Sequence, residues 1–128
     1  MSECQLEKNF NLKEFQCRDG TPVPEDMCDN VAELAKNLQV IRDTICKPMI
    51  IISGYRSPEY NTKIDGAKRS QHLLAKAADI VVPDMEPSEL KEVIESLIED
   101  GKITPGGVGI YSTFVHYDIR GYNRRWSG

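Results

Sequence analysis

The sequence contains only two histidines, and each lies close to an aspartate. His72 belongs to the segment Ser70–Asp79 and is followed seven residues later by Asp79, while His116 precedes Asp118 by two residues. Two imidazoles and one carboxylate leave a fourth tetrahedral position of zinc open for water, as a hydrolytic zinc site requires. We therefore expect His72, Asp79 and His116 to meet in space and to bind one catalytic zinc ion.

The local sequence around these side chains indicates which elements position them. A spacing of seven would also place His72 and Asp79 on one face of a helix. Gly66 upstream and the strand-like segment 77–82 downstream favour a loop or short helical turn for His72 and a strand for Asp79. Residues two apart on a strand share a face. Asp118 is therefore expected beside His116, where it either orients the imidazole or acts as a base.

Helical and strand patterns are interspersed along the chain. Apolar residues recur at three- and four-residue steps in the expected helices, and apolar β-branched runs mark the expected strands. The helices are expected at residues 25–46, 58–64 and 87–100, and the strands at 49–52, 77–82, 108–111 and 114–119. The last two strands are joined tightly as a hairpin, so the sheet cannot be all parallel. The pattern predicts one α+β domain of 128 residues, with a small mostly antiparallel sheet packed against helices.

Charge and hydropathy exclude some classes of partner. The net charge is −4 and the pI is about 5.2, which argues against nucleic acid as the main partner. Arg120, Arg124 and Arg125 are the only basic concentration, and we interpret them as a solvated C-terminal surface rather than a phosphate site. No apolar stretch reaches the 18 residues of a membrane span. We expect a monomer without a membrane span.

The N-terminus and the cysteines bear on the compartment. The segment Met1–Glu7 is acidic and has no apolar h-region, so we expect no signal peptide. The protein would then be cytoplasmic at synthesis and would leave the cell only by lysis or by a route that the chain does not encode. No C-x-x-C pair occurs, which disfavours a structural zinc or redox motif, and reduced thiols are the default. A Cys17–Cys28 pairing stays open. The cysteines are Cys4, Cys17, Cys28 and Cys46.

Four short motifs follow one another along the chain. They are S-G-Y-R-S at 53–57, S-x-H at 70–72, A-x-D at 77–79 and F-V-H-Y-D at 114–118. Together, from about Asn9 to Trp126, they resemble the zinc D-Ala-D-Ala carboxypeptidase family, and in particular its small single-domain members from bacteria and phages. The resemblance implies a hedgehog-type (DD-peptidase) α+β fold. It also implies one zinc ion and cleavage of peptide bonds in the stem peptide of peptidoglycan, in the cell wall.

The same resemblance implies roles for individual residues. Arg56 matches the family arginine near the substrate, where a guanidinium binds a terminal carboxylate or polarises the scissile carbonyl. An arginine that stabilises its own loop is the alternative. Ser70 and Gln71 match residues that flank the pocket and hydrogen-bond the substrate. The residues that match the zinc ligands are His72, Asp79 and His116.

Two positions depart from the family pattern. Ala75 replaces the family glycine between the first two ligands. If that position needs a positive φ, alanine adds strain of about 1 kcal/mol or more. Thr113 stands where many members carry an acid that serves as the general base. Asp118 is the acid near the metal by motif, and we assign it the base role provisionally.

The sequence therefore favours zinc-assisted hydrolysis of a stem-peptide bond, by a D-Ala-D-Ala carboxypeptidase-like enzyme or a related endopeptidase. In this hypothesis Asp118 accepts a proton and Arg56 holds a substrate carboxylate or stabilises the oxyanion. A non-catalytic zinc-containing domain that binds the cell wall or builds a virion is the alternative, and Ala75 and Thr113 favour it slightly. A scaffold that binds no zinc is the third hypothesis. The sequence leaves open whether the bond that is cleaved is terminal or internal in the stem peptide.

Overall fold

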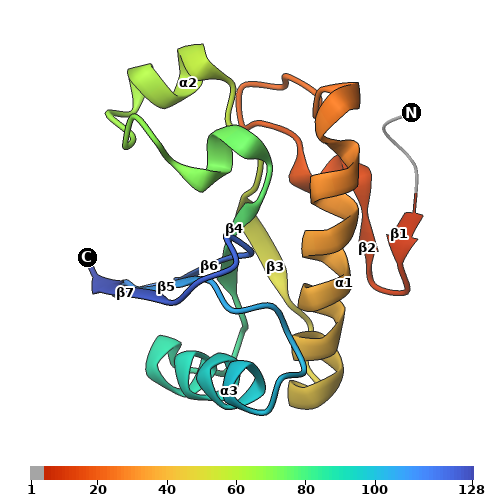
Figure 1. Ribbon diagram of the computed structural model, residues 1–128, viewed down its shortest axis with the longest axis vertical. Coiled ribbons are helices and arrows are strands. Elements are labelled where there is room, and N and C mark those ends of the chain that lie inside the picture. Colours follow the sequence, from red (N-terminus) through yellow and green to blue (C-terminus); the bar gives the residue numbers. More distant parts are fainter. Residues whose placement is uncertain (1–4) are drawn as a thin grey trace.

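A five-stranded sheet forms the centre of the fold (Figure 1). The structure is a computed structural model that describes residues 5–128. The strand order is β3-β4-β6-β5-β7, and all neighbours are antiparallel except β5 and β7, which pair in parallel. This arrangement confirms the predicted α+β fold with a mostly antiparallel sheet. The strands are β3 (Ile50–Ser53), β4 (Ala77–Val81), β5 (Gly107–Ile110), β6 (Val115–Asp118) and β7 (Arg124–Ser127).

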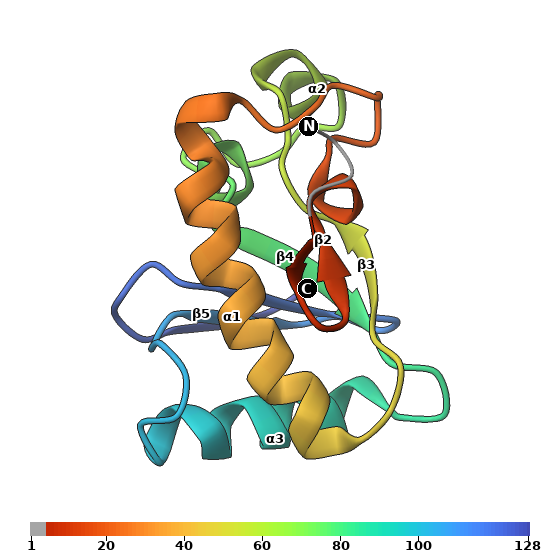
Figure 2. The same ribbon diagram turned by 90° about the vertical axis from the view of Figure 1, so that its right-hand side faces the viewer.

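Two long helices pack against each other and against the sheet. Helix α1 (Cys28–Ile45) follows a 3-10 turn at Glu25–Met27 and runs across one face of the sheet, and α3 (Pro87–Glu99) contacts both α1 and β5 (Figure 2). Both were predicted from their apolar stripes. Most of the stripe is buried in α1, and Val31, Leu34 and Leu38 have no exposed surface. Burial of each such side chain stabilises the fold by about 1.5–3 kcal/mol.

The N-terminal part adds a small sheet that was not predicted. Strands β1 (Gln5–Glu7) and β2 (Phe10–Asn11) pair in antiparallel, and a 3-10 turn follows at Leu12–Phe15. The rings of Phe10 and Phe15 are buried against each other at 6.3 Å between centroids. They close the end of the core beside the loop that carries the S-G-Y-R-S motif. The Phe15 carbonyl accepts the Tyr55 N–H of that loop.

Two predictions about the sheet need correction. The short apolar run at 49–52 is typical of a buried strand, but β3 is an edge strand and Ile50 is 49% exposed. The strand β7 was not predicted at all, since its sequence, R-R-W-S, was interpreted as part of a solvated surface. A strand that pairs with a distant partner leaves little local signal when charged residues occupy half of it.

The described cysteines, Cys17, Cys28 and Cys46, are free thiols, so no Cys17–Cys28 disulfide is present. Cys4 lies outside the described residues. The expectation of no signal peptide depends on the segment Met1–Glu7, whose first four residues also lie outside the described part of the chain. No helix among residues 5–128 has the length and apolar character needed to cross a bilayer.

Candidate functional site

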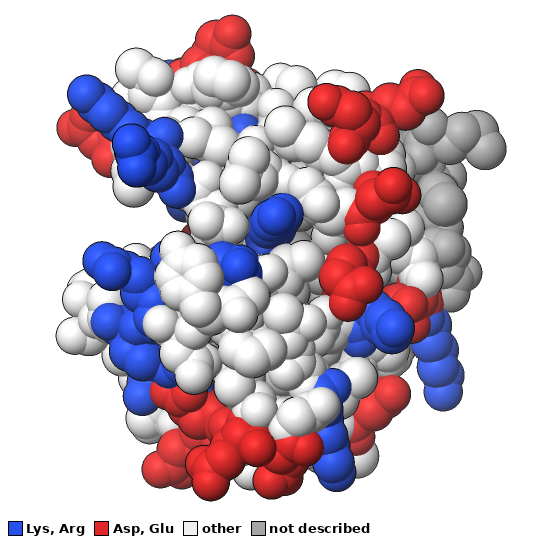
Figure 3. Space-filling view, viewed as in Figure 1, with Lys and Arg blue, Asp and Glu red and all other residues white. Residues whose placement is uncertain are grey.

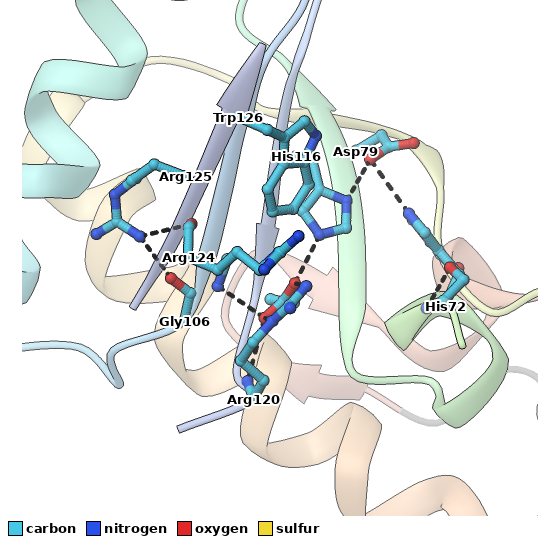
Figure 4. A network of polar contacts seen from close by, with 12 residues as sticks. His72, Asp79, Gly106, His116, Arg120, Arg124, Arg125 and Trp126 are labelled. Atoms are coloured by element: carbon cyan, nitrogen blue, oxygen red, sulfur yellow. Dashed lines mark hydrogen bonds and ion pairs between the residues drawn. The ribbon is translucent and has the colours of Figure 1, made fainter. Parts of the chain in front are cut away.

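The three predicted metal ligands lie together, on two paired strands and one helical turn (Figure 4). Asp79 on β4 and His116 on β6 are direct cross-strand partners, so their side chains stand on the same face of the sheet. His72 belongs to the 3-10 turn η3 (Gln71–Leu74), as a short turn rather than a long helix was expected. Asp79 Oδ1 lies 3.2 Å from His72 Nε2 and 3.1 Å from His116 Nδ1. All three side chains are buried.

The loop before α2 and the cap of η3 position His72. The Ser70 hydroxyl accepts the His72 N–H at 3.2 Å and so caps η3. On the ring, His72 Nδ1 donates to the Gly54 carbonyl at 2.6 Å. Gly54 is required at this point, since a Cβ there would lie 2.9 Å from the backbone of Phe15. The loop carbonyl therefore fixes the orientation of the imidazole.

On the other side of the site, Asp118 holds His116. His116 Nε2 donates to Asp118 Oδ2 at 2.7 Å, and the two side chains share a face of β6, as predicted. The Gly107 N–H donates to Asp118 Oδ1 at 2.8 Å. Arg120 Nε and Nη2 bind the two carboxylate oxygens at 2.9 and 2.7 Å. Asp118 is fully buried, and each of its oxygens accepts at least two hydrogen bonds.

The hydrogen bonds of the two rings fit a metal cation between them. The Gly54 carbonyl can only accept, so Nδ1 of His72 carries a proton and Nε2 of the neutral ring is a lone pair. That lone pair faces the Asp79 carboxylate, which also only accepts. A cation between the two groups turns this repulsion into attraction. Two imidazole nitrogens and one carboxylate oxygen, each ring oriented by a second hydrogen bond, are a donor set suited to zinc.

The pKa values follow from burial and from these hydrogen bonds. Burial lowers the pKa of His72, which favours its neutral form. For His116 burial acts in the same direction, but the hydrogen bonds to Asp118 and Asp79 outweigh it and raise the pKa. Burial alone would raise the pKa of Asp79, yet the close approach of the His116 and His72 rings outweighs burial and holds the pKa well below its usual range. Asp79 is therefore ionised and able to bind a cation.

The predicted substrate-binding residues border this site. Arg56 Nη2 lies 3.7 Å from Asp79 Oδ2, while Nη1 donates to Asn61 Oδ1 of α2 (Pro58–Lys63) at 3.2 Å. The guanidinium thus supports its own loop and also reaches the site. Its Nε is buried and has no hydrogen-bond partner among the described residues. Ser70 and Gln71 line the same cleft as the three grouped side chains.

That cleft has a volume of about 1000 Å³ and opens between the loop after α2 and the strand β7 (Figure 3). Sequence reasoning missed the aromatic wall that β7 and the β5–β6 hairpin contribute. Trp126 lies 4.9 Å from His116 between ring centroids, and its Nε1 donates to the Tyr111 hydroxyl at 2.9 Å. Tyr111 stacks on Phe114 at 4.4 Å. All three aromatic rings line the cleft.

Glycines in β5 make room for this wall. Gly109 pairs in register with Trp126, and a Cβ on Gly109 would clash with the indole. A Cβ on Gly107 would likewise clash with the Asp118 carboxylate. The alternation of glycines at 107 and 109 was a signal for a closely packed neighbouring strand.

The interpretation of the basic cluster as a solvated surface is wrong for Arg120. The side chain of Arg120 is 14% exposed and forms an ion pair with Asp118. The guanidinium also lies over the rings of Tyr122 and Trp126, at 5.8 and 5.6 Å. In the sequence, Arg120 follows Asp118 by two positions and precedes Tyr122 by two, and this spacing was the local signal available for such a network.

Ala75 occupies the conformation that explains the family glycine. It ends η3 with φ +58°, in the left-handed region, so the strain of about 1 kcal/mol expected for alanine applies. Ala75 is also fully buried in the core. Burial of one methyl group contributes about 0.8 kcal/mol, which offsets most of the strain. The substitution is compatible with the local structure of the site.

Comparison with known families gives one match. The model of the family Peptidase M15 matches residues 8–118. The matched range contains the three grouped side chains and Asp118, and it ends before β7. A comparison with curated proteins found no match.

Proposed function

Because the chain belongs to the peptidase M15 family, whose members are zinc-dependent, we propose that it hydrolyses a peptide bond in the stem peptides of peptidoglycan. The activity would be that of a D-Ala-D-Ala carboxypeptidase or a related endopeptidase. One zinc ion would bind to His72 Nε2, the Asp79 carboxylate and His116 Nδ1. The observation that supports this is their mutual approach within 4.8 Å, with both remaining ring nitrogens already hydrogen-bonded.

When bound, zinc supplies a Lewis acid that polarises the scissile carbonyl and lowers the pKa of water. The side chains of the cleft then bind and orient the peptide. Arg56 is assigned to a substrate carboxylate or to the developing oxyanion, since one of its Nη atoms faces the site and its Nε has no partner within residues 5–128. Ser70 and Gln71 are assigned to hydrogen bonds with the peptide backbone, because both line the cleft.

The geometry favours the orienting role over the base role for Asp118. A base must reach a proton of water or substrate, but Asp118 is fully buried and both of its oxygens are occupied. We therefore assign Asp118 to fixing the tautomer and orientation of His116. Asp65 and Asp79 are the acids among the described residues that line the cleft. Asp65 is exposed there and is the side chain that we propose to test as proton acceptor.

The decisive experiment is metal analysis combined with product mass on defined muropeptides. The zinc-loaded protein should contain one zinc ion per chain and release D-alanine or a stem-peptide fragment, while the metal-free protein should release neither. His116→Ala should lose stoichiometric zinc and at least ~100-fold of the activity, since even residues around metal ligands contribute 10–100-fold. Thr113→Ala is the matched control, because Thr113 lies in the same hairpin but does not line the cleft.

Other outcomes would support the rival functions. Muropeptide binding without cleavage by the zinc-loaded protein would indicate a non-catalytic wall-binding or virion-structural domain. Protein purified without chelator that contains no stoichiometric metal would indicate a scaffold. In the proposed function the chain acts as a single-domain monomer. Its substrate lies in the cell wall, which it would reach after lysis or export.

A further inference from the structure

The cleft is more cationic than the molecule that surrounds it. The whole chain has 16 Lys and Arg against 20 Asp and Glu. Figure 3 shows Lys and Arg side chains on both sides of the hollow at the left of the view, with an acidic group beside the upper ones, while most acidic side chains lie at the right and at the bottom. Such separation of charge attracts an anionic ligand to the cleft. The charged residues that line it are Arg56, Arg69, Arg120, Arg124, Asp65 and Asp79.

Two of the four arginines have no partner for their charge in the part of the chain that the structure describes. Arg120 is neutralised by Asp118, and Arg56 lies next to Asp79. Arg69 and Arg124 are exposed, and among residues 5–128 neither side chain forms an ion pair or hydrogen bond. Both therefore offer a full guanidinium to a ligand in the cleft.

The backbone holds these two arginines on opposite sides of the cleft. Arg69 lies in the loop after α2, in a turn closed by a hydrogen bond from the Ser70 N–H to the Ala67 carbonyl at 3.1 Å. Arg124 begins β7, and its N–H donates to the Gly106 carbonyl at 3.3 Å. In Figure 1 the loop after α2 lies above β7, across the hollow seen in Figure 3. The two side chains can thus approach a ligand from two sides.

We propose that Arg69 and Arg124 form a second carboxylate subsite at the mouth of the cleft, separate from Arg56 beside the metal ligands. The preferred substrate would be an anionic peptide that carries a side-chain carboxylate in addition to the one near the scissile bond. Guanidinium groups suit this ligand because they bind carboxylates through two parallel N–H bonds. The inference rests on the proposed peptidase function of the same cleft.

Binding can be measured apart from turnover, because Trp126 is the only tryptophan and lines the cleft. The probes are two acetylated peptides that end in D-Ala-D-Ala. They differ only in the residue directly before D-Ala-D-Ala, which is Glu in one peptide and Gln in the other. In a second pair, the Glu or Gln lies one residue further from the D-Ala-D-Ala end. Trp126 emission recorded by stopped flow, before the peptide is cleaved, gives the Kd of each peptide. We expect the zinc-loaded protein to bind a Glu peptide about threefold to tenfold more tightly than its Gln partner, as two partly solvated ion pairs allow.

The variants locate the preference. Arg69→Gln and Arg124→Gln should each reduce the preference for Glu, and together they should remove it, with the affinity for the Gln peptide unchanged. Arg124→Lys, which keeps the positive charge, should retain part of the preference for the Glu peptide. Lys102→Gln is the matched control, since it removes an exposed charge outside the cleft. Far-UV circular dichroism checks that each variant is folded.

The outcomes separate this subsite from the peptidase function. Equal affinity for Glu and Gln peptides, absence of binding, or a preference that survives in the double variant overturns the subsite. Product mass on the same peptides tests the reaction independently. Selective binding without hydrolysis would leave the subsite standing and remove the peptidase function, and hydrolysis without selectivity would do the reverse.

Discussion

Each imidazole of the candidate metal centre has one ring nitrogen committed to a protein acceptor. For His72 the acceptor is the Gly54 carbonyl, and for His116 it is the Asp118 carboxylate. The ligand types and their order along the chain were predictable, because zinc chemistry restricts them to a few residue types. The acceptors were predictable only in part. Asp118 follows from the two-residue period of a strand, whereas Gly54 is brought in by tertiary packing against Phe15.

The role of Asp118 leads to the first prediction at this scale. Asp118→Asn should weaken zinc affinity by about 10–100-fold, because an amide cannot satisfy both His116 and Arg120 as the carboxylate does. Asp65→Asn is the comparison, and it should keep the zinc affinity while lowering the rate if Asp65 accepts the proton. Chelator competition measures the first quantity and initial rates the second. Unchanged zinc affinity in Asp118→Asn would contradict the orienting role.

The pH dependence of stability in the metal-free protein provides a second readout of Asp118. Burial alone would raise the pKa of Asp118, but hydrogen bonds from His116, Arg120 and Gly107 hold it well below its usual range. The unfolded chain has an aspartate pKa of about 3.9. The carboxylate therefore contributes stability above that pH and loses it as the pH falls toward the folded pKa. In urea denaturation, the difference in the free energy of unfolding between wild type and Asp118→Asn should become smaller below about pH 4.

At the scale of elements, the long helices and the central strands were predictable because their apolar periodicity is strong. The strand β7 was not, since arginines occupy two of its four positions and leave little strand signal in the sequence. Arg125 anchors β7 to α3 through Glu95, at 2.7 Å from Nε to Oε2. The wall of the cleft therefore depends on an element whose location only tertiary structure reveals.

The close packing of β5 and β7 can be tested with Gly109→Ala. The added methyl group would clash with Trp126 and push the indole away from His116. We expect a loss of about 1–3 kcal/mol in the free energy of unfolding, as for other overpacked sites. Trp126 emission should shift to the red, and zinc affinity should fall. Trp126→Phe is the control, because it keeps a ring on His116 without the N–H to Tyr111. An unchanged emission maximum in Gly109→Ala would contradict the packing.

At the scale of the whole molecule, the interspersed helix and strand patterns and the hairpin late in the chain were sufficient for the prediction of an α+β fold. The cationic cleft was not predictable from net charge, because a total of −4 averages over both faces. The core lies between α1, α3 and the sheet, and its buried residues, such as Leu34, Ile80 and Ile94, do not line the metal-site cleft. The fold should therefore persist without metal.

Metal removal tests this independence. Zinc at a free concentration of 100 times its Kd stabilises the folded state by about 2.7 kcal/mol. For a chain of this size, removal of zinc should therefore lower the Tm by roughly 10 °C. The metal-free protein should still unfold in one cooperative transition, measured by calorimetry with and without chelator. A metal-free protein without such a transition would show that the fold itself requires the ion.

The direct pairing of Asp79 with His116 across β4 and β6 has a dynamic consequence. These strands lie inside the sheet, and a bound ion would join them side chain to side chain as well as by their backbone. Any fluctuation that separates the two strands would then also have to break metal–ligand bonds. Amide hydrogen exchange in β4 and β6 should therefore slow in proportion to zinc occupancy, while exchange along the outer side of β3 stays the same. The ion would therefore slow the opening of the sheet only between β4 and β6, the two strands that carry its ligands.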